Sequence, residues 1–158
     1  MPRRFLPLLL AALTLPGCLP EADVPEVTLA EAFAFEVVGR GLRASLDTTE
    51  VAIRDAATWA AYRDSLRPLQ PFDSVDFAQE MVLLAAVPVP SGGYSIEFET
   101  VERAGGDSLT AAYILSTPGY DCIPTMGGAV VFQAVRMARI PAPVHFTHQT
   151  EAYRCTER

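Results

Sequence analysis

Few residues in this chain have the types and spacing that chemistry requires. The only two histidines are His145 and His148, and an acidic side chain, Asp121, lies well before them. In a strand, positions three apart point to opposite faces, so a metal shared by the two histidines is disfavoured. One alternative function is left open, in which the loop 117–128 with Asp121, His145 or His148 binds a small ligand or hydrolyses a substrate.

One serine has neighbours that resemble those of a hydrolase nucleophile. Gly93 and Ser95 match the first part of a Gly-x-Ser-x-Gly motif, but Glu97 stands where the last glycine belongs. That motif also needs a helix directly after the serine, whereas the residues after Ser95 alternate as in a strand. Ser95 is therefore expected to be a strand residue, and the sequence predicts no catalytic residue and no enzyme activity.

The charged residues exclude further classes of function. All 12 basic residues are Arg, which excludes lysine Schiff bases, Ser-x-x-Lys nucleophiles and phosphate-loop lysines. The formal net charge is -7, and no basic stripe opposes it, so nucleic-acid binding is disfavoured. No cofactor is predicted.

The N-terminal residues have the layout of a bacterial export signal. Arg3 and Arg4 precede an apolar run, 5–15, that is too short to span a membrane. The residues Leu-Pro-Gly-Cys at 15–18 resemble a lipobox, in which the cysteine receives the lipid. The sequence therefore predicts a lipoprotein signal peptide over 1–17, lipid attachment at Cys18, and a protein held at the membrane by that lipid.

Cysteine parity supports the lipid assignment. The chain has three cysteines, and lipidation of Cys18 leaves Cys122 and Cys155 as an even pair. In an exported protein such a pair is most simply a disulfide, here closing a loop of about 34 residues. A nucleophilic or metal-bound thiol is the less favoured alternative.

A stretch near the middle of the chain best defines the domain. Residues 81–87 are almost continuously apolar, as in a strand buried on both faces. Ser91, Gly92 and Gly93 follow as a turn, and from Tyr94 to Val101 apolar and polar residues alternate, which predicts a second strand. An acidic tether over 18–31 is expected to join the lipid to a single domain over 32–158.

One helix is expected among the strands. Asp55 can cap its N-terminus, Trp59, Tyr62 and Leu66 form an apolar stripe, and Pro68 ends it. Trp59 is expected to be a core residue. Further strands are predicted over 33–38, 51–54, 109–115, 129–140 and 144–150. The fold class is therefore α+β, a mainly antiparallel sheet of about six or seven strands with one amphipathic helix packed on it.

The arrangement of these segments resembles the C-terminal domain of the PrcB family of bacterial lipoproteins and exported proteins. The matching segments are 51–55 running into the helix with Trp59, 75–77 with 81–83, and 90–97. The family signature is Ser91, Gly92, Gly93, Tyr94 and Ser95. The family is named for an accessory subunit that stabilises a subtilisin-type surface protease complex. The resemblance therefore implies an accessory subunit without catalytic residues.

Together these observations predict a lipid-anchored, non-enzymatic protein of the bacterial cell envelope, exposed on its periplasmic or cell-surface side. Its partners would be the membrane, through the lipid, and a protein such as an envelope or surface protease complex. We expect the contact surface to be either the sheet face that bears Tyr94 or the loop 117–128.

Overall fold

A computed structural model describes residues 30–43, 47–103 and 106–157 of the chain. The predicted signal peptide, Cys18 and all but the last two residues of the predicted tether lie outside this part. Glu31, which we assigned to the tether, instead belongs to the first strand, because it pairs with Arg103.

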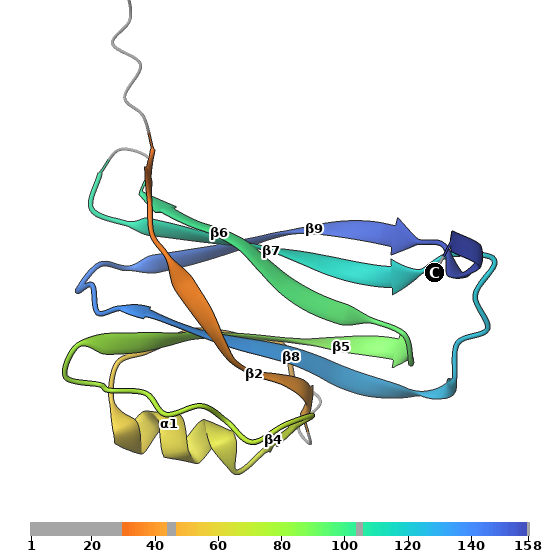
Figure 1. Cartoon of the computed structure of the whole chain (residues 1–158), viewed down its shortest axis with the longest axis horizontal. Helices are drawn as coiled ribbons and strands as arrows, with labels where there is room; N and C mark the ends of the chain where they lie inside the picture. The colour runs from red at the N-terminus through yellow and green to blue at the C-terminus, as the bar shows by residue number, and fades with distance from the viewer. Residues whose placement is uncertain (1–29, 44–46, 104–105, 158) are drawn as a thin grey trace, which may run out of the picture.

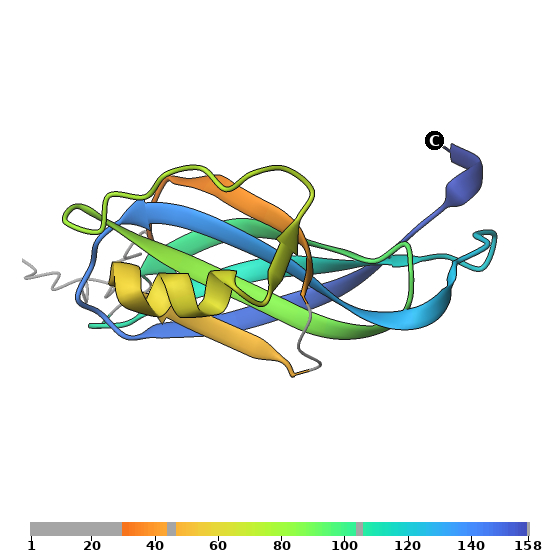
Figure 2. The same cartoon turned by 90° about the horizontal axis from the view of Figure 1, so that it is seen from below.

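The described residues form three layers. Two β-sheets pack face to face, and helix α1 (Ala56–Arg63) covers the outer side of the second sheet (Figure 1). Seen from below, the helix lies over the strands of that sheet (Figure 2). The described part of the chain is therefore mostly β, with one short α-helix, in agreement with the α+β class predicted, although its strands form two sheets where one was expected.

Each sheet is made of strands that are not all consecutive in the chain. The first sheet, in spatial order, is β1 (Glu31–Ala32), β6 (Ser95–Arg103), β7 (Leu109–Pro118) and β9 (Val144–Tyr153). The second is β3 (Thr49–Ile53), β5 (Glu80–Ser91), β8 (Met126–Ala138), β2 (Phe35–Arg43) and β4 (Leu66–Pro68). All neighbours are antiparallel except β7 and β9, which are parallel.

The expected number of six or seven strands was too low, because the described chain has nine. The additional strands, β1 and β4, have two and three residues. Segments this short have no hydrophobic period of their own, and they are extended only because β6 and β2 supply hydrogen-bonding partners.

The central strands β5 and β8 are buried on both faces. Alternate residues of each contribute to two hydrophobic clusters, one between the sheets and one between the second sheet and the helix layer. In β5, Leu83 faces the first cluster and Leu84 the second. The apolar run 81–87 is therefore buried on both sides, as predicted.

The helix begins where the sequence predicted and ends earlier. Asp55 caps it by accepting a hydrogen bond from the Thr58 amide at 2.8 Å, and Trp59 is buried. The helix ends at Arg63, however, so Leu66 buries its side chain from β4 rather than from the helical stripe. Pairing of β4 with β2 ends the helix before Pro68.

Two predicted boundaries also moved. Strand β5 continues through Pro88 and Pro90 to Ser91, because its neighbour β3 pairs only with residues 82–86. Beyond that point one side of β5 has no strand beside it, so a proline costs no ladder hydrogen bond there. The loop predicted over 117–128 shrinks to residues 119–125, because β7 and β8 both extend into it.

A buried polar side chain, Gln133, joins the two sheets by a hydrogen bond. The predicted alternation in β8 places Gln133 on the face toward the other sheet, where it is buried. Its Oε1 accepts a hydrogen bond of 2.7 Å from the Phe98 amide, at the point where a bulge interrupts the pairing of β6 with β7. Gln133 thus supplies the acceptor that the bulge removes from the ladder.

Candidate functional site

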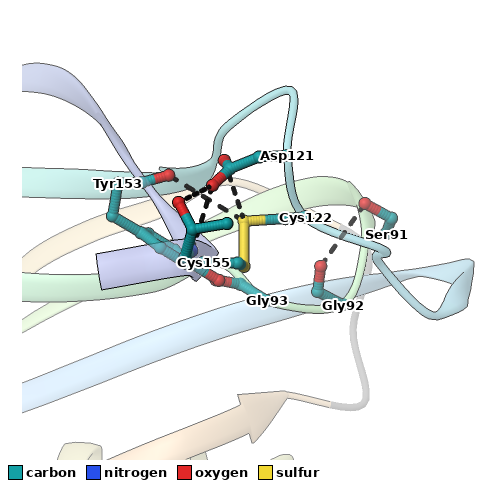
Figure 3. The surroundings of a disulfide bond; sticks show 8 residues. Ser91, Gly92, Gly93, Asp121, Cys122, Tyr153 and Cys155 are labelled. Carbon is teal, nitrogen blue, oxygen red and sulfur yellow. Dashed lines mark hydrogen bonds between the residues drawn. A yellow bond between two sulfur atoms is a disulfide. The ribbon is translucent and has the colours of Figure 1, made fainter. Parts of the chain in front are cut away.

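The most distinctive surface feature is the loop of residues 119–125, between β7 and β8. It lies at the end of the sandwich opposite to the point where the described chain begins (Figure 1). A disulfide joins Cys122 in this loop to Cys155, which follows β9 in a short 3-10 helix (Figure 3). The structure therefore contains the cysteine pair that the sequence predicted.

A carboxylate next to the disulfide holds the loop at a second point. Asp121 Oδ2 accepts hydrogen bonds from the Thr156 amide at 3.0 Å and from the Thr156 hydroxyl at 2.9 Å. The bond from the Thr156 amide is the main reason that the pKa of Asp121 lies below its usual value. Asp121 is thus a bracing residue, with no catalytic partner among these contacts.

The glycine turn between β5 and β6 packs against the loop and is hydrogen-bonded to its end and to β9. The Gly92 amide donates to the Thr125 carbonyl at 3.1 Å, and the Tyr153 hydroxyl donates to the Gly93 carbonyl at 2.8 Å. Gly93 has a φ of +92°, which favours glycine, and a side chain at Gly92 would overlap Thr125. The turn between β5 and β6 needs both glycines to hold the loop this closely (Figure 3).

The braced loop and the first residue of β8 present large apolar side chains to solvent. Tyr120 is 91% exposed, and Ile123 and Met126 are each 99% exposed. Isolated exposed apolar residues are ordinary, but Tyr120 and Ile123 lie on the covalently held loop and Met126 directly follows it as the first residue of β8, so three of them come close together along the chain. We call Tyr120, Ile123 and Met126 the apolar tip.

The other candidate residues are not brought together. His145 and His148 lie on opposite faces of β9, as predicted for positions three apart in a strand. Asp121 bonds to Thr156, beyond the end of β9, and Tyr153 at that end of the strand is about 16 Å along β9 from His148. Ser95 is an exposed strand residue that pairs with Ser116.

His148 instead takes part in a contact between the two sheets. Its ring stacks on the Tyr113 ring with centroids 5.1 Å apart, and the Tyr113 hydroxyl donates to Glu50 Oε1 at 2.6 Å. Burial, together with the Glu50 carboxylate, raises the pKa of Tyr113. This contact joins the edge strands β9 and β3 through Tyr113 of β7.

The cavities lie elsewhere in the molecule. A surface cavity of about 370 Å³ is lined by residues of β2 and of the segment after β4, including Arg40, Leu69 and Asp73. Neither this cavity nor a smaller one beside Arg136 is lined by Asp121, His145 or His148. Within the described ranges, no three His, Cys, Asp or Glu side chains are grouped as a metal site would require.

Sequence reasoning placed the loop but did not show that these apolar side chains are exposed. The signal available was the spacing of Tyr120, Ile123 and Met126 around Cys122, in a segment without helical or strand periodicity. That pattern alone does not tell an exposed apolar residue from a buried one, because burial of a loop depends on the strands around it.

Comparisons with known proteins add no relative. No family model matches the chain, and no curated protein or solved structure matches it either. In the part of the chain that the structure describes, no helix has the length and apolar character needed to cross a membrane. The disulfide is compatible with an exported protein, since such bonds persist in oxidising compartments.

Proposed function

We propose that this chain is a lipid-anchored, non-enzymatic accessory protein of the bacterial cell envelope, and that its apolar tip binds a protein partner. The observation that carries the proposal is the near-complete exposure of Ile123, on a loop fixed by a disulfide, and of Met126, where β8 begins directly after that loop. Burying one such side chain in an interface contributes about 1.5–3 kcal/mol. Because the loop is already held in place, less conformational entropy is lost when a partner binds it.

The geometry of the sandwich fits an anchor at one end and a contact surface at the other. The described chain starts at the end opposite to the apolar tip (Figure 1). A lipid on Cys18 would be joined to Ala30 by a segment that spans at most about 40 Å. The tip would then project away from the membrane surface, where a protein partner can reach it.

The PrcB resemblance suggests the class of partner. Its signature glycines, Gly92 and Gly93, lie directly beneath the proposed contact loop and hold it through Thr125 and Tyr153. A family signature that supports the loop is consistent with a contact role there. The partner we propose is an envelope or surface protease complex, which the protein would stabilise without contributing catalytic residues.

Replacing all three residues of the apolar tip with serine should abolish partner binding. The measurement is crosslinking in native membranes followed by affinity purification of the full lipoprotein. We expect a partner to be recovered with the wild type and to be reduced at least about tenfold with the triple variant, since each lost apolar contact is worth more than 1 kcal/mol. The fold should be unchanged, because these side chains are exposed.

The matched control is Leu69→Ser, which removes an exposed apolar side chain away from the tip. It should leave partner recovery at the wild-type level. Recovery that falls equally with the control, or a wild type that never crosslinks to another protein, would contradict the proposal.

The anchor can be tested separately at Cys18. Cys18→Ser removes the thiol that would carry the lipid, so we expect the protein to be released from membranes or to remain unprocessed. Membrane fractionation with mass spectrometry of the N-terminus measures both effects. Unchanged membrane retention of a normally processed protein would disprove lipidation at this residue.

A further inference from the structure

The outer edge of β9 is long and regular. Ten consecutive residues of β9 pair with β7 without a register shift, and no described strand pairs with its other side. The prolines Pro141 and Pro143 both lie before the strand begins. An edge of this kind leaves a row of unpaired N–H and C=O groups that can form hydrogen bonds with another strand.

The other sheet edges in the described chain have the features that usually prevent such pairing. Strand β3 has five residues and leads directly into the helix, and β4 has three residues and ends at Pro68. Strand β6 is covered in part by β1, and its bulge is bonded to Gln133. Short strands, proline and bulges protect edges, so β9 is the exception.

Two hydrogen bonds show which backbone groups of β9 face outward. The Pro143 carbonyl accepts from the Leu109 amide, and the Tyr153 carbonyl accepts from the Gly119 amide. In a parallel pair, alternate residues direct both N–H and C=O to the neighbour, so the odd-numbered residues face β7. The outward-facing residues are therefore Val144, Phe146, His148, Thr150 and Ala152.

We propose that two copies of this chain form a dimer in which their β9 edges pair antiparallel about a twofold axis at His148. Antiparallel pairing places outward-facing residues opposite one another. Among the symmetric registers, the one centred on His148 pairs all five outward-facing residues, so that Phe146 faces Thr150 of the second copy. Registers centred elsewhere leave at least one outward-facing residue at an end without a partner.

The side chains on the outer face of β9 are self-complementary in this register. His145 lies opposite Glu151 of the second copy, and Thr147 lies opposite Gln149, each pair occurring twice by symmetry. An imidazole N–H can donate to a carboxylate, and a hydroxyl can bond to an amide. Cross-strand polar pairs of opposite character favour one register over its neighbours.

The edge is also held rigid before it pairs. The His148 ring stacks on Tyr113, and the Tyr113 hydroxyl bonds to Glu50 of the other sheet. These contacts fix the residue on the twofold axis and leave its backbone N–H and C=O facing outward. The dimer therefore forms without rearrangement of β9.

The test is Thr150→Pro, measured by native mass spectrometry of the full-length protein across a dilution series. Thr150 has an outward-facing N–H, so proline leaves the bonds to β7 intact while removing one donor from each of two symmetric pairs. We expect the wild type to be dimeric and the dissociation constant to rise at least about tenfold with the variant. Thr150→Ala, which keeps the N–H, should remain dimeric.

A second pair of variants tests the register independently of proline. His145→Glu places two carboxylates opposite each other at both ends of the pairing, and should weaken the dimer. Adding Glu151→His to that variant exchanges the two residues and should restore the dimer. A general effect on the fold cannot produce this rescue.

Each outcome bears on the proposal. If the wild type remains a monomer at every concentration, the proposal of a dimer is overturned. This holds also if the β9 edge of that monomer binds an unrelated peptide. A dimer that persists with Thr150→Pro and with His145→Glu also overturns it, since another surface must then mediate association. These readouts do not depend on the apolar tip or on Cys18, so the proposed function can fail or stand separately.

Discussion

Leu84→Ala is expected to lower the free energy of unfolding by about 3–5 kcal/mol. Leu84 is 0% exposed and lies in the middle of β5, between β3 and β8, with its side chain toward the helix layer. Neighbouring strands fix the backbone on both sides, so the surroundings can collapse only partly into the space left by the side chain. A small domain is stable by only about 5–15 kcal/mol, so this loss is a large fraction.

The control for this variant is Leu69→Ala, which makes the same chemical change at a residue that is 76% exposed. We expect its free energy of unfolding to stay within about 0.5 kcal/mol of the wild type. Urea unfolding followed by the fluorescence of Trp59, the single tryptophan, measures both variants. Equal losses for the two leucines would contradict the burial that the fold assigns to them.

Removing the disulfide is expected to lower the free energy of unfolding by about 3–4 kcal/mol. Cys122 and Cys155 are separated by 33 positions, and the bond between them restricts the unfolded chain over that length. The double variant Cys122→Ser with Cys155→Ser should also loosen the apolar tip, because the Asp121–Thr156 bonds then hold the loop without covalent support.

Thermal or urea unfolding of the double variant measures this loss, and the reduced wild type is its control. Both should show the same decrease, since both lack the same bond. A decrease smaller than about 1 kcal/mol in the double variant would mean that the loop is already restricted in the unfolded chain. Partner crosslinking by the double variant should fall as well, if the loop is the contact surface.

The disulfide could be predicted from the sequence, whereas the exposed apolar surface next to it could not. Counting cysteines and assigning Cys18 to the lipid left one possible pair, so Cys122 and Cys155 needed no structural information. The exposure of Ile123, by contrast, depends on where β7 and β8 end and on how the Gly92–Gly93 turn packs against Thr125. These are contacts between segments distant in the chain.

Local patterns determined much of the fold. Asp55 caps the helix because its side chain accepts a hydrogen bond from the amide three residues later in the chain. The side chains of β8 alternate between two hydrophobic clusters because the two faces of the strand pack against different layers. These properties depend on neighbours a few positions away. The same patterns overextended the helix to Leu66, because no local signal shows that β4 will pair with β2.

The sequence by itself determined the chemical character of this protein: an acidic chain without lysine, one cysteine pair and a glycine turn. Only the tertiary structure decided which strands became edges, that β9 runs parallel to β7, and that Tyr120, Ile123 and Met126 are exposed at and directly after a braced loop. The physical reason is that sheet order and exposure come from contacts between distant segments, whereas composition, caps and periodicity are properties of each segment alone.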